Sequence, residues 1–179
     1  MAVGSRRKEQ EEKWTFAPVI MLSCDVTKQR KQAYIPISEI LTKEHCRDKH
    51  SFVQEKALYL EVVETENARA DRRSKNPIVD FCVGIRKGKS RMIRLVEAKF
   101  DVDNLKNLES SNIPEKVKHS NDILLSEAIP IESGAIVLIK SGSIAQQQKR
   151  RLSDILRAKG HHYSVKTVAE FYNDYFKVS

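Results

Sequence analysis

The chain has 179 residues, of which 40% are hydrophobic and 31% are charged. This length can bury one hydrophobic core, and no apolar run approaches the ~20 residues that a membrane-spanning helix needs. The polar segment 1–13 lacks the apolar stretch of a secretory signal. We therefore expect a flexible charged tail over 1–13 and a single domain over 14–179. We also expect the protein to be cytoplasmic and not to associate with a membrane.

Lysine and arginine number 32 against 24 acidic residues, which gives a formal net charge of +8. A basic surplus of this size is typical of proteins that meet nucleic-acid phosphates. The three cysteines, Cys24, Cys46 and Cys82, are widely spaced and lack the pairing of a zinc site. Reduced thiols are the simplest reading of that spacing.

Residues 14–26 are apolar and β-tending, with an interruption at Pro18, and predict a strand or an extended edge. Residues 37–48 follow Pro36 and predict a short helix capped by Ser38.

A longer helix is predicted over 51–67, with Ser51 as its N-cap. On a helical wheel Glu55 falls on the apolar side, beside Tyr59 and Val62. A carboxylate on a buried face is costly unless it is paired or bound to a metal. The alternative is an ordinary first-turn glutamate, favoured by the helix dipole and partly exposed. Glu66 shares roughly the same side of the helix.

A basic loop over 68–76 leads into two apolar runs, 77–85 and 92–100, which predict a β-hairpin. If Gly88 and Lys89 form a two-residue loop, the register places Asp80 directly opposite Glu97. Like charges at such positions, with Cβ atoms roughly 5 Å apart, are destabilising. A divalent cation between the two carboxylates is the simplest reason for the arrangement.

Lys99 points to the same side of its strand as Glu97, because side chains alternate along a strand. Hard cations such as Mg²⁺ prefer one or two carboxylates together with waters and substrate phosphate. A metal at Asp80 and Glu97 would polarise a phosphodiester and activate a water, and a lysine would orient that water or offset the developing charge. An exposed hairpin face with an ordinary glutamate and lysine is the structural alternative.

The segments Pro77-Ile78-Val79-Asp80 and Leu95-Val96-Glu97-Ala98-Lys99-Phe100 resemble the two halves of the PD-(D/E)xK nuclease motif. The proline lies two residues further from the aspartate than in that pattern. The resemblance implies an α/β, restriction-endonuclease-like core with a mixed central sheet flanked by helices. It also implies Mg²⁺ or Mn²⁺ held by Asp80, Glu97 and the Ala98 carbonyl, with Lys99 orienting the water.

In that family a helix before the hairpin often adds a glutamate to the metal site, and Glu55 is the candidate here. The family core also has a strand between its first helix and its aspartate-bearing strand. Two segments are candidates for it: the run 59–63, which would shorten the predicted helix, and the segment 14–22. The substrate implied by the resemblance is DNA rather than RNA.

Beyond the hairpin, residues 101–112 predict a loop with one helical turn, and a helix with Pro114 in its first turn extends to Glu127. The run 134–139 predicts a strand buried on both faces. A helix capped by Ser143 should reach Ala158 and stop at Gly160. A short strand over 162–166 and a closing helix over 167–177 complete the expected order.

Candidate nucleic-acid contacts lie on two of these helices, at Lys116, Lys118, Lys149, Arg150 and Arg151. A solvated charged surface is the alternative for any one of them. The sequence thus favours a metal-dependent nuclease, acting alone, as a homodimer or with a partner protein. Two other readings are a catalytically inactive subunit of the same fold, which binds DNA or protein, and a basic interaction module.

Overall fold

The computed structural model describes residues 13–18, 31–46, 52–100, 112–125, 129–142, 145–158 and 163–177. Its elements, in chain order, are β1 (Thr15–Ala17), η2 (Lys31–Ala33), β2 (Tyr34–Pro36), α2 (Ile37–Lys43), β3 (Lys56–Tyr59), α3 (Leu60–Ala70), β4 (Phe81–Lys87), β5 (Ser90–Lys99), α5 (Ile113–Leu124), β6 (Ile131–Ile139), α6 (Ala145–Ala158), β7 (Ser164–Thr167) and α7 (Val168–Tyr175).

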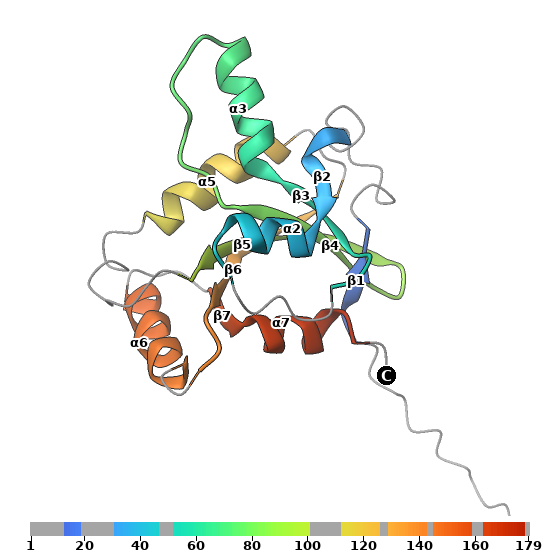
Figure 1. The fold of residues 1–179 in the computed structure, drawn as a ribbon, viewed down its shortest axis with the longest axis vertical. Helices are drawn as coiled ribbons and strands as arrows, with labels where there is room; N and C mark the ends of the chain where they lie inside the picture. Colours follow the sequence, from blue (N-terminus) through green and yellow to red (C-terminus); the bar gives the residue numbers. More distant parts are fainter. Residues whose placement is uncertain are drawn as a thin grey trace, which may run out of the picture.

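One mixed sheet organises the domain (Figure 1), in the order β2-β3-β4-β5-β6-β7. Strands β2 to β5 are antiparallel neighbours, and β6 and β7 add in parallel. Apolar residues of α3, α5 and α6 pack on one face of the sheet, and those of α2 and α7 pack on the other. The expected α/β architecture with helices on both faces is confirmed.

The β4–β5 hairpin has the expected register. Lys87 pairs with Ser90 across the two-residue loop, and Phe81 pairs with Val96 at the far end. Gly88 opens the loop with φ 55°, a conformation that costs glycine little. A one-residue slip would turn every side chain of β5 to the opposite face.

The remaining edge of β4 is divided between two short strands. β3 pairs with its beginning, where Tyr59 faces Phe81, and β1 pairs with its end, where Ala17 faces Gly84. Of the strand expected over 14–26, residues 15–17 are extended, and 19–26 lie outside the described residues.

The prediction of a helix over 51–67 is wrong at its start. Residues 56–59 form β3, and α3 begins only at Leu60 and continues to Ala70. The reason is non-local: β3 bonds to β2 on one side and to β4 on the other, and these ladders outweigh the helical spacing. Ser51 lies outside the described residues.

Helices α2 and α3 both end on a left-handed residue that is not glycine. After α2, which stops at Lys43 and has Pro36 rather than Ser38 as its N-cap, His45 has φ 61°. After α3, Arg72 has φ 53°. In each case the N–H of the left-handed residue and the N–H of the residue after it bond back to carbonyls of the last turn, as in a Schellman motif. The left-handed region costs an ordinary residue about 1 kcal/mol.

The C-terminal elements follow the sequence prediction closely. Pro114 lies in the first turn of α5, β6 has a buried stretch from Ala135 to Ile139, and α6 ends at Ala158. α7 begins after Thr167, which forms a capping box with Glu170. Segments 1–12 and 101–111, together with Ser143 and Gly160, lie outside the described residues.

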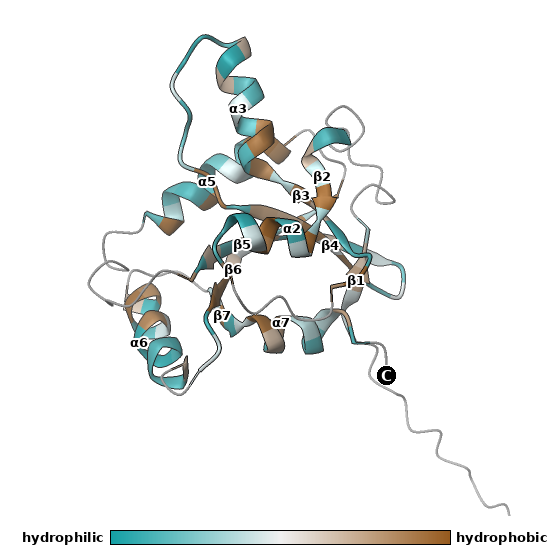
Figure 2. Cartoon of the chain, in the orientation of Figure 1, coloured by the Kyte–Doolittle hydropathy of each residue, from teal (hydrophilic) through white to brown (hydrophobic). Residues whose placement is uncertain are grey.

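Hydropathy follows this layering, since the strands at the centre are mostly hydrophobic while the free end of α3 and the loop after it are hydrophilic (Figure 2). Within the described ranges, no helix is long and apolar enough to cross a bilayer.

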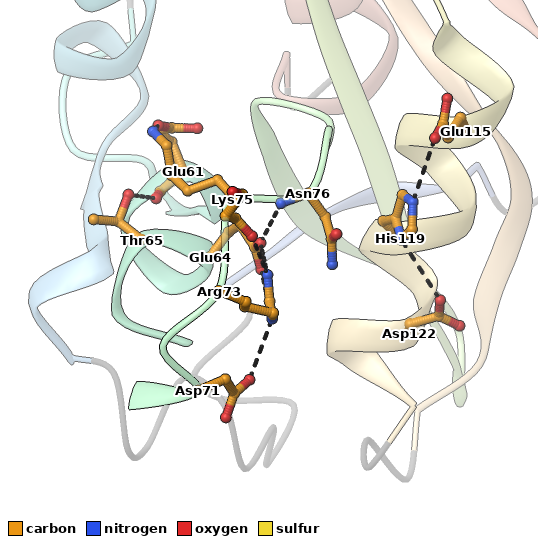
Figure 3. A network of polar contacts seen from close by, with 11 residues as sticks. Glu61, Glu64, Thr65, Asp71, Arg73, Lys75, Asn76, Glu115, His119 and Asp122 are labelled. Carbon is orange, nitrogen blue, oxygen red and sulfur yellow. Dashed lines mark hydrogen bonds and ion pairs between the residues drawn. The ribbon is translucent and has the colours of Figure 1, made fainter. Parts of the chain in front are cut away.

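Glu64 fixes the loop that connects α3 to β4 (Figure 3). Its side chain is fully buried and accepts two hydrogen bonds from Arg73, at 2.5 and 3.1 Å, and one from the Asn76 N–H at 2.6 Å. Burial alone would raise the pKa of Glu64, but the bonds from Arg73 and Asn76 hold it below its usual range. Glu61 and Lys75 form a second, exposed ion pair between the same helix and loop.

We expect Glu64→Ala to lower the free energy of unfolding by about 2 kcal/mol, because it removes a buried carboxylate that accepts three hydrogen bonds, two of them from a charged guanidinium group. Since the folded pKa is depressed, the contribution of Glu64 is present above the ordinary glutamate pKa and is lost as pH falls through the folded pKa. Urea unfolding at pH 7 and at low pH measures both effects. Glu61→Ala, which breaks the exposed pair, is the matched control and should cost less than about 1 kcal/mol. Equal losses in the two variants would contradict this role for Glu64.

Candidate metal-dependent active site

Asp80 lies immediately before β4 and is held by three neighbouring elements. Its carbonyl accepts the Leu60 N–H at 2.9 Å, at the start of α3. Its carboxylate Oδ2 accepts the Ala98 N–H of β5 at 2.5 Å. The preceding residue, Val79, donates its N–H to the buried Ser120 hydroxyl of α5 at 2.9 Å. The aspartate therefore lies beside the end of β5, as the hairpin register predicts.

Glu97 is fully buried on β5 and points to the same face of the sheet as Asp80. Its Oε1 atom accepts from Lys99 Nζ and from Lys116 Nζ, each at 2.7 Å. Its Oε2 atom has no hydrogen-bond partner among the described residues. A buried carboxylate oxygen without a partner is costly, and such an atom often marks a ligand position.

The predicted convergence of Asp80, Glu97 and Lys99 is thus present. The structure gives Lys116 a more specific position than the sequence suggested. It was a candidate for nucleic-acid contact on the surface of a helix, but its side chain is only 24% exposed and bonds to Glu97. The docking of α5 against β5, which brings it there, is a long-range contact that periodicity does not reveal.

The charges of the site act on one another. The pKa of Asp80 is raised well above its ordinary value, first by burial and then by the negative charges of Glu97 and Glu44; the Ala98 N–H and Lys116 oppose the shift. Burial disfavours the charge of Lys116, but attraction by Glu97, Asp80 and Glu44 raises its pKa above the ordinary lysine value. The negative charge of Asp80 is therefore not fully compensated by its neighbours.

Glu44 is the acidic residue that the sequence analysis missed. It follows the last residue of α2, and its Oε1 accepts the Tyr59 hydroxyl at 3.0 Å. Its charge acts on both Asp80 and Lys116. The sequence does contain a signal for Glu44. Helical spacing places its carboxylate on the apolar side of α2, together with Ile37, Ile40 and Leu41.

Glu55 was the expected glutamate, and its predicted placement on a buried helix face is wrong. It precedes β3, and its carboxylate accepts the N–H of the neighbouring Gln54 at 3.1 Å. Its carbonyl accepts the Ile37 N–H at 2.9 Å, which ties the start of α2 to the strand. Glu66, on α3, accepts from Gln32 at 2.6 Å.

The other predicted cationic contacts lie on helix surfaces. Lys118 is exposed on α5, and Arg150 and Arg151 are exposed on α6. Lys149 is instead bonded to Glu170 of α7 at 2.8 Å, which links the two helices. Of these four residues, Lys118, Arg150 and Arg151 present their charge to solvent.

Asp80 and Glu97 fit a hard divalent cation better than a metal that needs a full protein ligand set. Among the described residues there is no cluster of three or more His, Cys, Asp or Glu side chains that could hold a metal ion. Mg²⁺ keeps several waters and commonly uses only one or two carboxylates. The unpartnered Glu97 Oε2 and the raised pKa of Asp80 are the local features that favour such an ion.

No family model matches the chain, and neither a curated protein nor a solved structure matches it. The interpretation of the site therefore rests on its own geometry and chemistry.

We expect Asp80→Asn to stabilise the fold at neutral pH in the presence of a chelator. The raised pKa means that the ionised carboxylate is a penalty in the folded state, which grows as pH rises through the folded pKa and is absent at low pH. Asparagine keeps an oxygen for the Ala98 N–H. A gain of about 1 kcal/mol would raise Tm by roughly 2–4 °C for a chain of this size.

Thermal unfolding across pH measures this effect, and the gain should shrink as pH falls. Asp154→Asn removes an exposed carboxylate of α6 and serves as the control, with a change below about 0.5 kcal/mol. Destabilisation by Asp80→Asn at neutral pH would contradict the inferred penalty.

Proposed function

We propose that this chain is a metal-dependent nuclease of the PD-(D/E)xK type that hydrolyses phosphodiester bonds, with DNA as the substrate. The observation that carries the proposal is the pair of carboxylates from adjacent strands, Asp80 and Glu97, with Lys99 bonded to Glu97 at 2.7 Å. Burial and mutual repulsion make this arrangement unfavourable for the apoprotein. Such a cost is expected where function requires it.

The order of elements supports the proposal. A helix (α2), an antiparallel strand (β3), the Asp80–Lys99 hairpin, a helix (α5) and a parallel strand (β6) follow one another, with α3 inserted before the hairpin. The presence of β3 ahead of Asp80 supports the resemblance, although it lies at 56–59 rather than at either predicted segment, 59–63 or 14–22. Glu44, at the end of α2, provides the acidic group from the preceding helix, in place of Glu55.

Each residue has a role that its position allows. Asp80 and Glu97 would hold Mg²⁺ or Mn²⁺, and the ion would polarise the scissile phosphate and lower the pKa of the attacking water. Lys99 lies on the same face and would orient that water or offset negative charge on the phosphorus centre. Lys116 and Glu44 contribute opposite charges to the electrostatic balance of the site.

One observation favours the second candidate, an inactive subunit of the same fold that binds DNA or protein. Two lysines share Glu97 Oε1, and Lys116 brings a positive charge to the place where a cation would act. An internal ammonium group can replace a metal in balancing buried carboxylates. The two candidates therefore differ in whether a metal displaces Lys116.

Plasmid incubation with Mg²⁺ or Mn²⁺ tests the nuclease. Asp80→Asn, Glu97→Gln and Lys99→Ala should each reduce cleavage by about 100-fold or more, because each removes a metal ligand or a charge used in the transition state. Asp154→Asn should cleave as the unmodified protein does. Cleavage that persists in Asp80→Asn would come from a contaminant and would contradict the assignment.

Titration calorimetry with Mn²⁺ separates the two candidates without requiring the right substrate. We expect the unmodified protein to bind Mn²⁺, Asp80→Asn to lose binding, and Lys116→Gln to bind more tightly, because the competing ammonium group is gone. Binding that appears only in Lys116→Gln would favour the inactive subunit. Lys118→Gln, an exposed lysine on the same helix, is the matched control.

A further inference from the structure

Helix α3 and the loop after it form an arm that projects from the sheet beside the candidate site (Figure 1). The base of the arm is fixed to the site, since the Leu60 N–H donates to the Asp80 carbonyl at 2.9 Å. From Leu60 to Arg69 the helix rises about 14 Å, at about 1.5 Å per residue. The arm tip, defined here as residues 69–72, is exposed.

The arm has a defined shape rather than a loose one. Figure 3 shows Glu64 and Glu61 of the helix facing Arg73, Lys75 and Asn76 of the returning loop. The first of these contacts is made by a fully buried carboxylate. Residues 73–76 are therefore bonded along α3, and these contacts set the position of the tip relative to Asp80.

Two guanidinium groups at the tip do not bond to other side chains of the described residues. Arg69 and Arg72 are exposed, and within the described part of the chain neither side chain forms an ion pair or a side-chain hydrogen bond. Their neighbours Arg73 and Lys75 are both paired to glutamates. The tip thus offers a net positive charge, partly offset by Asp71, which is bonded to Arg73.

Arg72 also occupies a backbone conformation that glycine would adopt with less strain, at φ 53°. The comparable position after α2 holds His45, and histidine tolerates the left-handed region better than most residues. No interaction of the Arg72 side chain compensates for the strain within the fold. The backbone N–H groups of Arg72 and Arg73 close α3 in a Schellman motif, so the conformation caps the helix while the Arg72 side chain stays exposed.

We propose that the arm tip contacts the phosphate backbone of double-stranded DNA through Arg69 and Arg72, to one side of the bond at the candidate site. This rests on the proposed function, because it takes the substrate of that site as the ligand. A tip about 14 Å from the base of the arm lies within the span of a few base-pair steps of 3.4 Å, so a duplex at the candidate site is long enough to meet it. Arginine suits the role because its planar group donates two hydrogen bonds to a phosphate.

Fluorescence anisotropy with a labelled duplex of about two helical turns, in Ca²⁺ to prevent cleavage, tests the contact across a range of salt concentrations. The double variant Arg69→Ala/Arg72→Gly should bind roughly tenfold more weakly. The slope of log affinity against log salt should fall by about 2, since each neutralised phosphate contributes about 0.9.

The matched control removes the same charge elsewhere. Arg86 and Arg91 are exposed cross-strand partners at the opposite end of the hairpin from Asp80 and Glu97. Arg86→Ala/Arg91→Ala should leave the salt slope unchanged. An equal loss in both double variants would reveal a general charge effect and would overturn the proposed contact.

Arg72→Gly alone separates binding from folding. It should raise Tm by about 2–4 °C through relief of strain while weakening DNA binding. Higher stability with unchanged binding would overturn the inference and leave the nuclease proposal intact. No DNA binding or cleavage by the unmodified protein would instead contradict the proposed function. Arm-dependent binding to an RNA duplex and not to DNA would overturn the choice of ligand.

Discussion

The pairing of β4 with β5 is the constraint on which the rest of the site depends. A two-residue loop at Gly88 leaves a single register, and that register decides which side chains share a face. Asp80 and Glu97 are brought together by backbone hydrogen bonding, even though their charges repel. The backbone hydrogen bonds between β4 and β5 thus offset the electrostatic repulsion between the two carboxylates and keep them close together.

The surrounding elements act on this pair from several directions. α5 brings Lys116 to Glu97 and Ser120 to the residue before Asp80, while α2 brings the charge of Glu44. α3 begins at the Asp80 carbonyl and sends its loop back to the same residue. The site is assembled from four segments that are far apart in the chain, so its geometry depends on the whole fold rather than on the hairpin alone.

Short-range features were predictable from the sequence, and long-range ones were not. The hairpin register, the face shared by Glu97 and Lys99, the strand ending at Ile139 and the helix ending at Ala158 follow from local spacing and turn chemistry. Residues 56–59 were read as helix because their spacing is compatible with one, whereas pairing on both sides makes them a strand. Lys116 was predicted to contact nucleic acid, and Glu44 was not singled out although its spacing places it on the apolar side of α2. Only tertiary docking brings their charges to Asp80 and Glu97.

The division of the β4 edge between β3 and β1 has a consequence for how the chain behaves outside its native contacts. β3 covers only the beginning of β4, and the three residues of β1 cover the rest, from Gly84 to Arg86. An unpaired strand edge can form hydrogen bonds with a strand of another chain, so β1 protects this part of β4 from intermolecular pairing. Protection of this edge therefore depends on a segment of three residues that pairs at the far end of the hairpin from Asp80 and Glu97.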